Sequence, residues 1–142
     1  MSESPFVPTI VGFFCKWCSY TAADLAGVSR STCPPTVRII RVMCSSRVDP
    51  LMVVTALLSG ADGVMIAGCH PGECHYRTGN YQTRRRFAML ESILGSLGLD
   101  TERLRISWIA ASEGHRVGEV ISRLTNSIQQ IGPNSARQAM FL

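Results

Sequence analysis

The chain has 142 residues, of which 46% are hydrophobic, and a formal net charge of +4. Its length is typical of one domain, and its apolar content is enough for one contiguous core without disulfide support. No apolar run approaches the roughly 20 residues of a membrane-spanning helix, and the N-terminal MSESPFVPT has neither the basic nor the hydrophobic region of a signal peptide. We therefore expect a cytoplasmic protein that does not enter a membrane.

Along the chain, short apolar strands alternate with helices. Four runs are rich in β-branched and aromatic side chains, as buried strands are. These runs are 7–14, 36–43, 63–67 and 104–110. Segments of helical length follow each of them, at 19–28, 49–60, 83–98 and 115–132.

The ends of the predicted helices carry the expected capping residues. Asp49 and Pro50 form a good N-cap and first-turn pair, and Gly60, Gly98 and Gly132 stand where C-caps are expected. The order βαβαβαβα with almost continuously apolar strands predicts an α/β fold with helices on both faces of the sheet. We expect a single doubly wound domain, Rossmann-like or flavodoxin-like, with a four-stranded parallel sheet over residues 1–132. A short C-terminal tail, 133–142, follows it.

Five of the six cysteines fall at the carboxyl end of this sheet. Cys15, Cys44 and Cys69 each follow a predicted strand, and Cys18 and Cys74 follow within CKWC and CHPGEC. The carboxyl edge of an open α/β sheet is where ligands gather, so we expect these thiols to converge. In a reducing compartment such a group indicates metal or redox chemistry rather than structural disulfides.

The remaining cysteine is a different case. Cys33 precedes Pro34 and Pro35 at the opposite end of the sheet, and we treat it as structural or incidental. The five edge thiols alone are compatible with three kinds of site: an iron–sulfur cluster, a zinc site, or a dithiol that exchanges disulfides through Cys15 and Cys18. Only CKWC matches a zinc knuckle, and a dithiol leaves three cysteines unexplained. An iron–sulfur cluster uses the most residues.

Three segments together, FFCKWCSY, RVMCSSRVDP and GCHPGECHYRTGN, resemble the delta (iron–sulfur) subunit of methyl-viologen-reducing, deazaflavin-non-reducing hydrogenase. The resemblance spans about residues 8 to 130. It implies a 2Fe-2S cluster and an electron-transfer role in the hydrogenase and heterodisulfide reductase complex of methanogens. The family's cysteines correspond to Cys15, Cys18, Cys44, Cys69 and Cys74; a 2Fe-2S cluster takes four, so one of them stands aside.

The resemblance also implies the partners. They are the small and large subunits of a nickel–iron hydrogenase, or a formate dehydrogenase, on one side and the flavin-containing subunit of heterodisulfide reductase on the other. We expect no catalytic residues in this chain, which carries no Ser-His-Asp set, P-loop or dinucleotide fingerprint. The relay would be one electron at a time.

Other polar residues stand near the same edge. His70 and His75 flank Cys74, and we expect them to support the site or contact a partner, since five cysteines make histidine ligation unnecessary. Arg84, Arg85 and Arg86 are expected to open a helix, where their charge opposes the helix dipole. No aromatic–basic motif accompanies them, so we expect no nucleic-acid partner. Trp17 could shield the site from water or simply pack in the core.

Overall fold

The computed structural model describes residues 6–29 and 34–134. The strands are β1 (Ile10–Cys15), β2 (Val37–Val42), β3 (Gly63–Gly68) and β4 (Leu104–Trp108). The helices are α1 (Ser19–Val28), α2 (Pro50–Leu58), α3 (Gly79–Ser96) and α4 (Gly114–Ile131), with short 3-10 helices η1 (Ser45–Arg47) and η2 (Thr101–Arg103). Cys33 and most of the expected tail lie outside the described residues.

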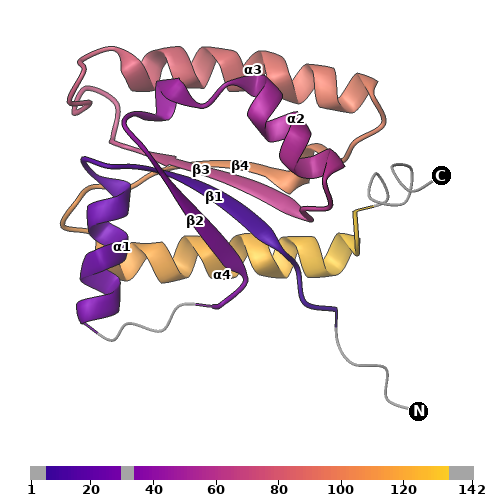
Figure 1. The fold of residues 1–142 in the computed structure, drawn as a ribbon, viewed down its shortest axis with the longest axis horizontal. Helices are drawn as coiled ribbons and strands as arrows, with labels where there is room; N and C mark the ends of the chain where they lie inside the picture. The colour runs from indigo at the N-terminus through magenta and orange to yellow at the C-terminus, as the bar shows by residue number, and fades with distance from the viewer. Residues whose placement is uncertain (1–5, 30–33, 135–142) are drawn as a thin grey trace.

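The four strands form one parallel sheet in the order β2-β1-β3-β4. Helices α1 and α4 lie on one face of this sheet, and α2 and α3 lie on the other (Figure 1). The predicted doubly wound α/β fold is therefore confirmed, with a flavodoxin-like strand order. No helix among the described residues is both long enough and apolar enough to cross a membrane.

Two apolar layers hold the helices to the sheet. Phe14 of β1 and Ile121 of α4 belong to the buried cluster on one face, and Phe13 of β1 and Leu90 of α3 belong to the cluster on the other. Successive strand residues point to opposite faces, so a continuous apolar strand serves both layers. Phe14 and Ile121 have no exposed surface, and burying each such side chain contributes roughly 1.5–3 kcal/mol.

The predicted caps are confirmed. Asp49 caps α2 by accepting a hydrogen bond from the N–H of Leu51 at 2.8 Å. Gly60, Gly98 and Gly132 all adopt the positive φ angles expected of residues that end a helix. Predicted and observed bounds of α1 agree, and the strands lie within the predicted runs or end a residue beyond them.

One boundary prediction was wrong. Helix α3 begins at Gly79, not at 83, so Arg84, Arg85 and Arg86 do not open it but lie one turn further in. Their charge therefore opposes the helix dipole less than expected, because that effect fades beyond the first turn. The earlier start is held by tertiary contacts: the side chain of Asn80, in the first turn, donates to the carbonyl of Cys69.

Candidate metal centre

The first pair of thiols lies where the strand order reverses. The chain passes from β1 outward to β2 and then returns to β3 on the other side of β1. Cys15 is the last residue of β1, and Cys69 follows β3 directly. Their sulfur atoms are 3.8 Å apart. These two thiols thus occupy the switch point at which open α/β sheets bind ligands.

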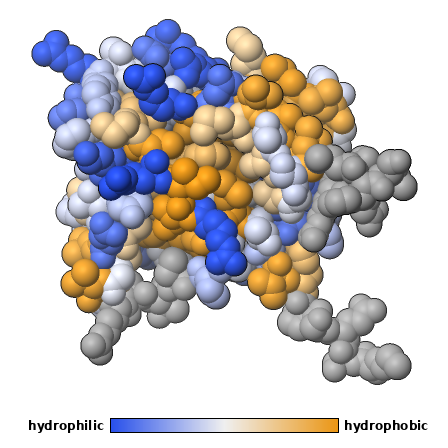
Figure 2. Space-filling view, viewed as in Figure 1, coloured by the Kyte–Doolittle hydropathy of each residue, from blue (hydrophilic) through white to orange (hydrophobic). Residues whose placement is uncertain are grey.

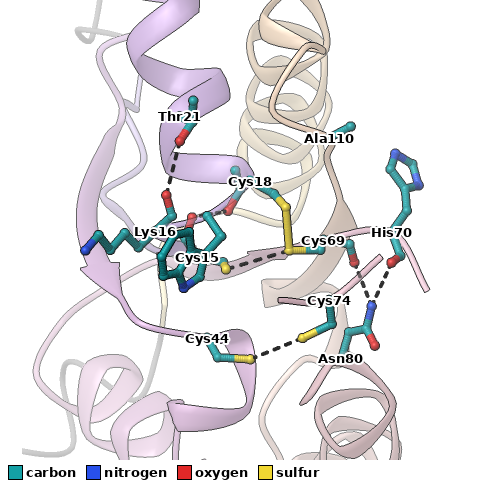
Figure 3. The surroundings of a disulfide bond; sticks show 12 residues. Cys15, Lys16, Cys18, Thr21, Cys44, Cys69, His70, Cys74, Asn80 and Ala110 are labelled. Carbon is teal, nitrogen blue, oxygen red and sulfur yellow. Dashed lines mark hydrogen bonds between the residues drawn. A yellow bond between two sulfur atoms is a disulfide. The ribbon is translucent and has the colours of Figure 1, made fainter. Parts of the chain in front are cut away.

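A second pair joins the neighbouring loops. Cys44 stands between β2 and η1, Cys74 stands in the loop before α3, and their sulfur atoms are 3.7 Å apart (Figure 3). The hydroxyl of Thr83 in α3 donates to Ser45 Oγ at 2.9 Å, which ties η1 to that helix. Cys44 is therefore held in a fixed position relative to α3.

Cys18 occupies a more open position. It is the N-cap of α1 and half-buried, whereas Cys15, Cys44, Cys69 and Cys74 are all buried. A disulfide joins Cys18 to Cys69, whose sulfur also contacts that of Cys15 (Figure 3). Within the described residues no three cysteine, histidine or acidic side chains surround a single metal-ion position. The five sulfur atoms thus form one group of three, from Cys15, Cys18 and Cys69, and one pair, from Cys44 and Cys74.

Helix α3 begins against the second pair. A Cβ atom on Gly79 would overlap Cys44 Sγ and lie 3.0 Å from Cys74 Sγ, so only glycine leaves room for both sulfurs. The next residue, Asn80, is buried and donates to the carbonyls of Cys69 and His70 at 3.1 and 2.8 Å. Its Oδ1 has no protein partner among the described residues. The first turn of α3 thus lines the thiol site and fixes the loop that carries Cys74.

Burial governs the acidity of the Cys15 thiol. Removal from water raises its pKa above the ordinary 9.0, although the backbone N–H groups of Trp17 and Cys18 act in the opposite direction. A thiolate at this position needs a compensating positive charge, which a bound metal supplies.

Nearby, buried Ser19 donates to the carbonyl of Ala67 at 2.7 Å and so joins the start of α1 to the end of β3.

Aromatic side chains that neighbour Cys18 and Cys74 in the sequence contact one another. The rings of Trp17 and His75 stack with centroids 3.7 Å apart, and His75 meets Tyr76 edge-on at 5.0 Å. Trp17 Nε1 also donates to the Tyr76 hydroxyl at 3.3 Å. These contacts join the CKWC turn to the loop of Cys74, and Trp17 remains 38% exposed rather than packed in the core.

His70 makes a different contact from His75. Its Nε2 lies against Glu113 Oε1, at the N-cap of α4, in a close hydrogen bond. The backbone N–H of Ala110 donates to the same oxygen at 2.9 Å. These contacts lower the pKa of Glu113 from 4.5 to about 2. The hydrogen bond from Ala110 makes the largest contribution, and the one with His70 makes the second largest. His70 therefore anchors the loop after β3 to α4.

Sequence reasoning missed Asn80 and Ser19, and it placed Gly79 in a loop near the sulfurs rather than in a helix. The predicted start of α3 at 83 left Gly79 and Asn80 in a loop, although Thr78 before them is a preferred N-cap residue and could have signalled the helix. No local pattern marks Ser19, because its role depends on a strand 48 residues away in the sequence.

The fold and the paired thiols define a class: a flavodoxin-like α/β protein whose cysteines line the carboxyl edge of the sheet. Residues 10–132 match the model of the family described as "Methyl-viologen-reducing hydrogenase, delta subunit". The chain belongs to this family, as the sequence resemblance implied.

Named relatives agree with this assignment. The chain is 49% identical over 133 residues to an iron–sulfur subunit of the "F420-non-reducing hydrogenase" of Archaeoglobus profundus, covering 94% of this chain and 96% of the relative. It is also 47% identical over 132 residues to one component of the "Ferredoxin:CoB-CoM heterodisulfide reductase" of Methanosarcina mazei, covering 93% of this chain but 16% of that longer protein. Homologues therefore include hydrogenase subunits and part of a heterodisulfide reductase component, which supports an electron-transfer role in that system.

Proposed function

We propose that this chain holds a 2Fe-2S cluster and relays single electrons from a nickel–iron hydrogenase, or a formate dehydrogenase, to the flavin-containing subunit of heterodisulfide reductase in the cytoplasm. The observation that carries the proposal is that four buried cysteines bring their sulfur atoms together two by two, Cys15 with Cys69 and Cys44 with Cys74. A 2Fe-2S cluster takes two thiolates at each of its irons.

The spacing within each pair fits this donor set. Two thiolates that share one tetrahedral metal are about 3.8 Å apart if the metal–sulfur bond is about 2.3 Å, the value for zinc. The sulfur–sulfur distance is 3.8 Å between Cys15 and Cys69 and 3.7 Å between Cys44 and Cys74. Gly79 leaves open the space beside Cys44 and Cys74 that a side chain would fill. A single zinc ion would instead need all four thiols around one point.

The fifth thiol then stands aside. Cys18 is the least buried of the five, and its disulfide to Cys69 must be reduced before Cys69 can act as a ligand. We assign Cys15, Cys44, Cys69 and Cys74 as the ligands and Cys18 as a neighbouring thiol. When bound, the cluster supplies one reversible one-electron step. The protein buries the ligands, holds their loops through Ser19 and Asn80, and restricts water with the aromatic group at Trp17.

The relatives support the proposed partners. The Archaeoglobus profundus relative is named as part of a hydrogenase. The Methanosarcina mazei relative carries a homologous stretch within a component of heterodisulfide reductase itself. A domain that shares one polypeptide with a reductase component in one organism is expected to dock against the equivalent component where the two are separate.

Metal and sulfide analysis tests the cofactor. Protein purified without oxygen should contain about two iron and two acid-labile sulfide per chain and give a rhombic electron-spin signal on one-electron reduction. Serine at Cys15, Cys44, Cys69 or Cys74 should lower the iron content, while Cys18→Ser should retain it. Zinc without iron, or equal iron loss in all five variants, would refute the assignment.

The disulfide favours a second candidate, a thiol–disulfide oxidoreductase. In that case the working bond is Cys18–Cys69, with the Cys15 thiol next to it, and not a bond within CKWC, because Cys15 is not joined to Cys18. Iron-free protein that reduces a disulfide substrate, and loses this activity on Cys18→Ser, would favour this candidate over the cluster.

A further inference from the structure

The edge strand β2 leaves apolar side chains exposed. It pairs only with β1 within the sheet, and none of its six residues is fully buried. Ile39 and Ile40 are 38% and 46% exposed, and Met43, just beyond the strand, is 48% exposed. The view toward β2 and α2 shows an apolar area over the centre of this face (Figure 2). Proteins usually cover such an edge with charge or with a partner.

A groove runs between this strand and α2. It has a volume of about 440 Å³ and is lined by Phe13, Ile40, Leu51 and Met52, with further apolar neighbours. Leu51 is 69% exposed, so the groove is open rather than part of the core. Its size and lining suit apolar side chains of a partner, which would bury surface that the isolated chain leaves in water.

A second hollow lies over Cys44. Its volume is also about 440 Å³, and its lining includes Met43, Arg47, Tyr76 and Arg86. The guanidinium of Arg86 donates to the carbonyl of Ser46 at 2.5 Å, which holds its charge at the rim. None of the described residues that line this hollow or the groove is acidic. Within the described part of the chain, neither arginine forms an ion pair.

The geometry points to one docking face, apolar over β2 and α2 and basic over Cys44, that receives an acidic segment with apolar anchors from the flavin-containing reductase subunit. This inference rests on the proposed function and assigns its surface. Ile40 lines the groove and Met43 lines the hollow over Cys44, so the two lie next to each other at the end of β2. An apolar centre with a charged rim is the usual composition of an interface, and the unpaired guanidiniums match carboxylates. Docking here places the partner over Cys44, which lines the second hollow and is one of the proposed ligands.

The opposite edge of the sheet offers a matched control. A smaller hollow of about 220 Å³ lies beside β4 and α4, and exposed Arg105 and Arg123 line it. The test compares Arg47→Glu/Arg86→Glu with Arg105→Glu/Arg123→Glu, so both double variants change the net charge equally. Ile40→Lys is a third variant that changes the groove without touching the arginines.

Binding is measured by isothermal titration with the flavin-loaded subunit of heterodisulfide reductase from the same organism, at 50 and 300 mM salt. We expect Arg47→Glu/Arg86→Glu to weaken binding at least about tenfold at low salt and to reduce the salt dependence, since like charges would face each other. Ile40→Lys should weaken binding about tenfold at both salt concentrations. The β4 double variant should bind within about twofold of the unaltered chain.

Several results would overturn the inference. Equal weakening by both double variants would show a general charge effect, and unchanged binding in Arg47→Glu/Arg86→Glu and Ile40→Lys would place the contact elsewhere. Loss of binding to the hydrogenase small subunit, while binding to the flavin-containing reductase subunit stays intact, would show that the occupant is wrong. Circular dichroism checks that each variant is folded. Iron content is measured separately, so failure of the cluster assignment and failure of the docking face are distinct outcomes.

Discussion

Replacing Gly79 with alanine probes the proposed centre without removing any thiol. The added Cβ would overlap Cys44 Sγ and lie 3.0 Å from Cys74 Sγ, so at least one of the two sulfurs must move. Alanine is compatible with the backbone, because Gly79 is not among the residues with positive φ. The variant should therefore retain its fold while disturbing the spacing of one thiol pair.

The size of the effect on stability follows from two opposing terms. Alanine in place of glycine in a helix gains about 1 kcal/mol, and forcing an extra methyl group into a packed site costs about 1–3 kcal/mol. The net change is a loss of about 0–2 kcal/mol, which lowers the melting temperature by at most about 6 °C in a chain of this size. The iron content should fall by a larger fraction than the stability, because the sulfurs of Cys44 and Cys74 can no longer share one metal.

Gly95→Ala in the same helix is the matched control. A Cβ at Gly95 meets only Thr101 Cγ2, at an ordinary 3.8 Å. We expect this variant to keep its full iron and sulfide and to melt about 2–3 °C higher, from a gain of about 0.5–1 kcal/mol. The assays are iron and sulfide per chain after anaerobic reconstitution, and thermal unfolding of the iron-free protein.

Full iron and sulfide in Gly79→Ala, with an unchanged electron-spin signal, would refute this reasoning. The start of α3 would then not border the cluster, and Cys44 and Cys74 would not be a ligand pair. If Gly79→Ala protein is unfolded, the overlap with the sulfurs costs more than about 2 kcal/mol. Gly79→Ser would not help, because serine carries the same Cβ atom. In that case the serine variants of Cys44 and Cys74 decide the assignment.

Three further predictions concern the scaffold. Ile121→Ala, which empties a fully buried position in α4, should lower the free energy of unfolding by about 2–5 kcal/mol in urea titration. Arg103→Met should lower the free energy of unfolding by about 3 kcal/mol, because the buried guanidinium donates to the carbonyls of Asp62, Gly132 and Pro133 and methionine leaves these acceptors unpaired. The control Arg105→Met, at an exposed position, should change it little. The folded-state pKa of Glu113, about 2, lies below its ordinary 4.5, so its stabilising contribution is complete above pH 4.5 and is lost as pH falls through 2. In the iron-free Glu113→Gln variant, the free energy of unfolding should therefore depend less on pH over that range. An unchanged pH dependence would contradict the assigned contacts of Glu113.

Several parts of the fold could be predicted from local chemistry alone. Strands at 36–43 and 104–110 and a helix at 19–28 follow from β-branched runs and apolar spacing, because short-range preferences and burial agree there. Asp49 identified the start of α2 for the same reason. The position of Cys15, Cys44 and Cys69 after successive strands indicated which edge of the sheet would carry the thiols.

Other features depended on residues far apart in the chain. Thr78 gives a local signal for the start of α3, but the hydrogen bonds that hold its first turn run from Asn80 to carbonyls of the loop after β3, and no local pattern encodes them. Likewise, only the folded chain pairs Cys15 with Cys69 and Cys44 with Cys74. Spacing in the sequence says that thiols reach one edge, but not which sulfurs meet.

The amino-acid order by itself determined the layered α/β architecture and the concentration of thiols at one end of the sheet. These follow from periodicity and from the common direction of parallel strands. The tertiary structure alone decided the pairing of the sulfurs, the glycine that makes room for them, and the exposure of β2 beside Cys44. Distances between atoms of different elements depend on how side chains pack, and packing is a property of the whole chain.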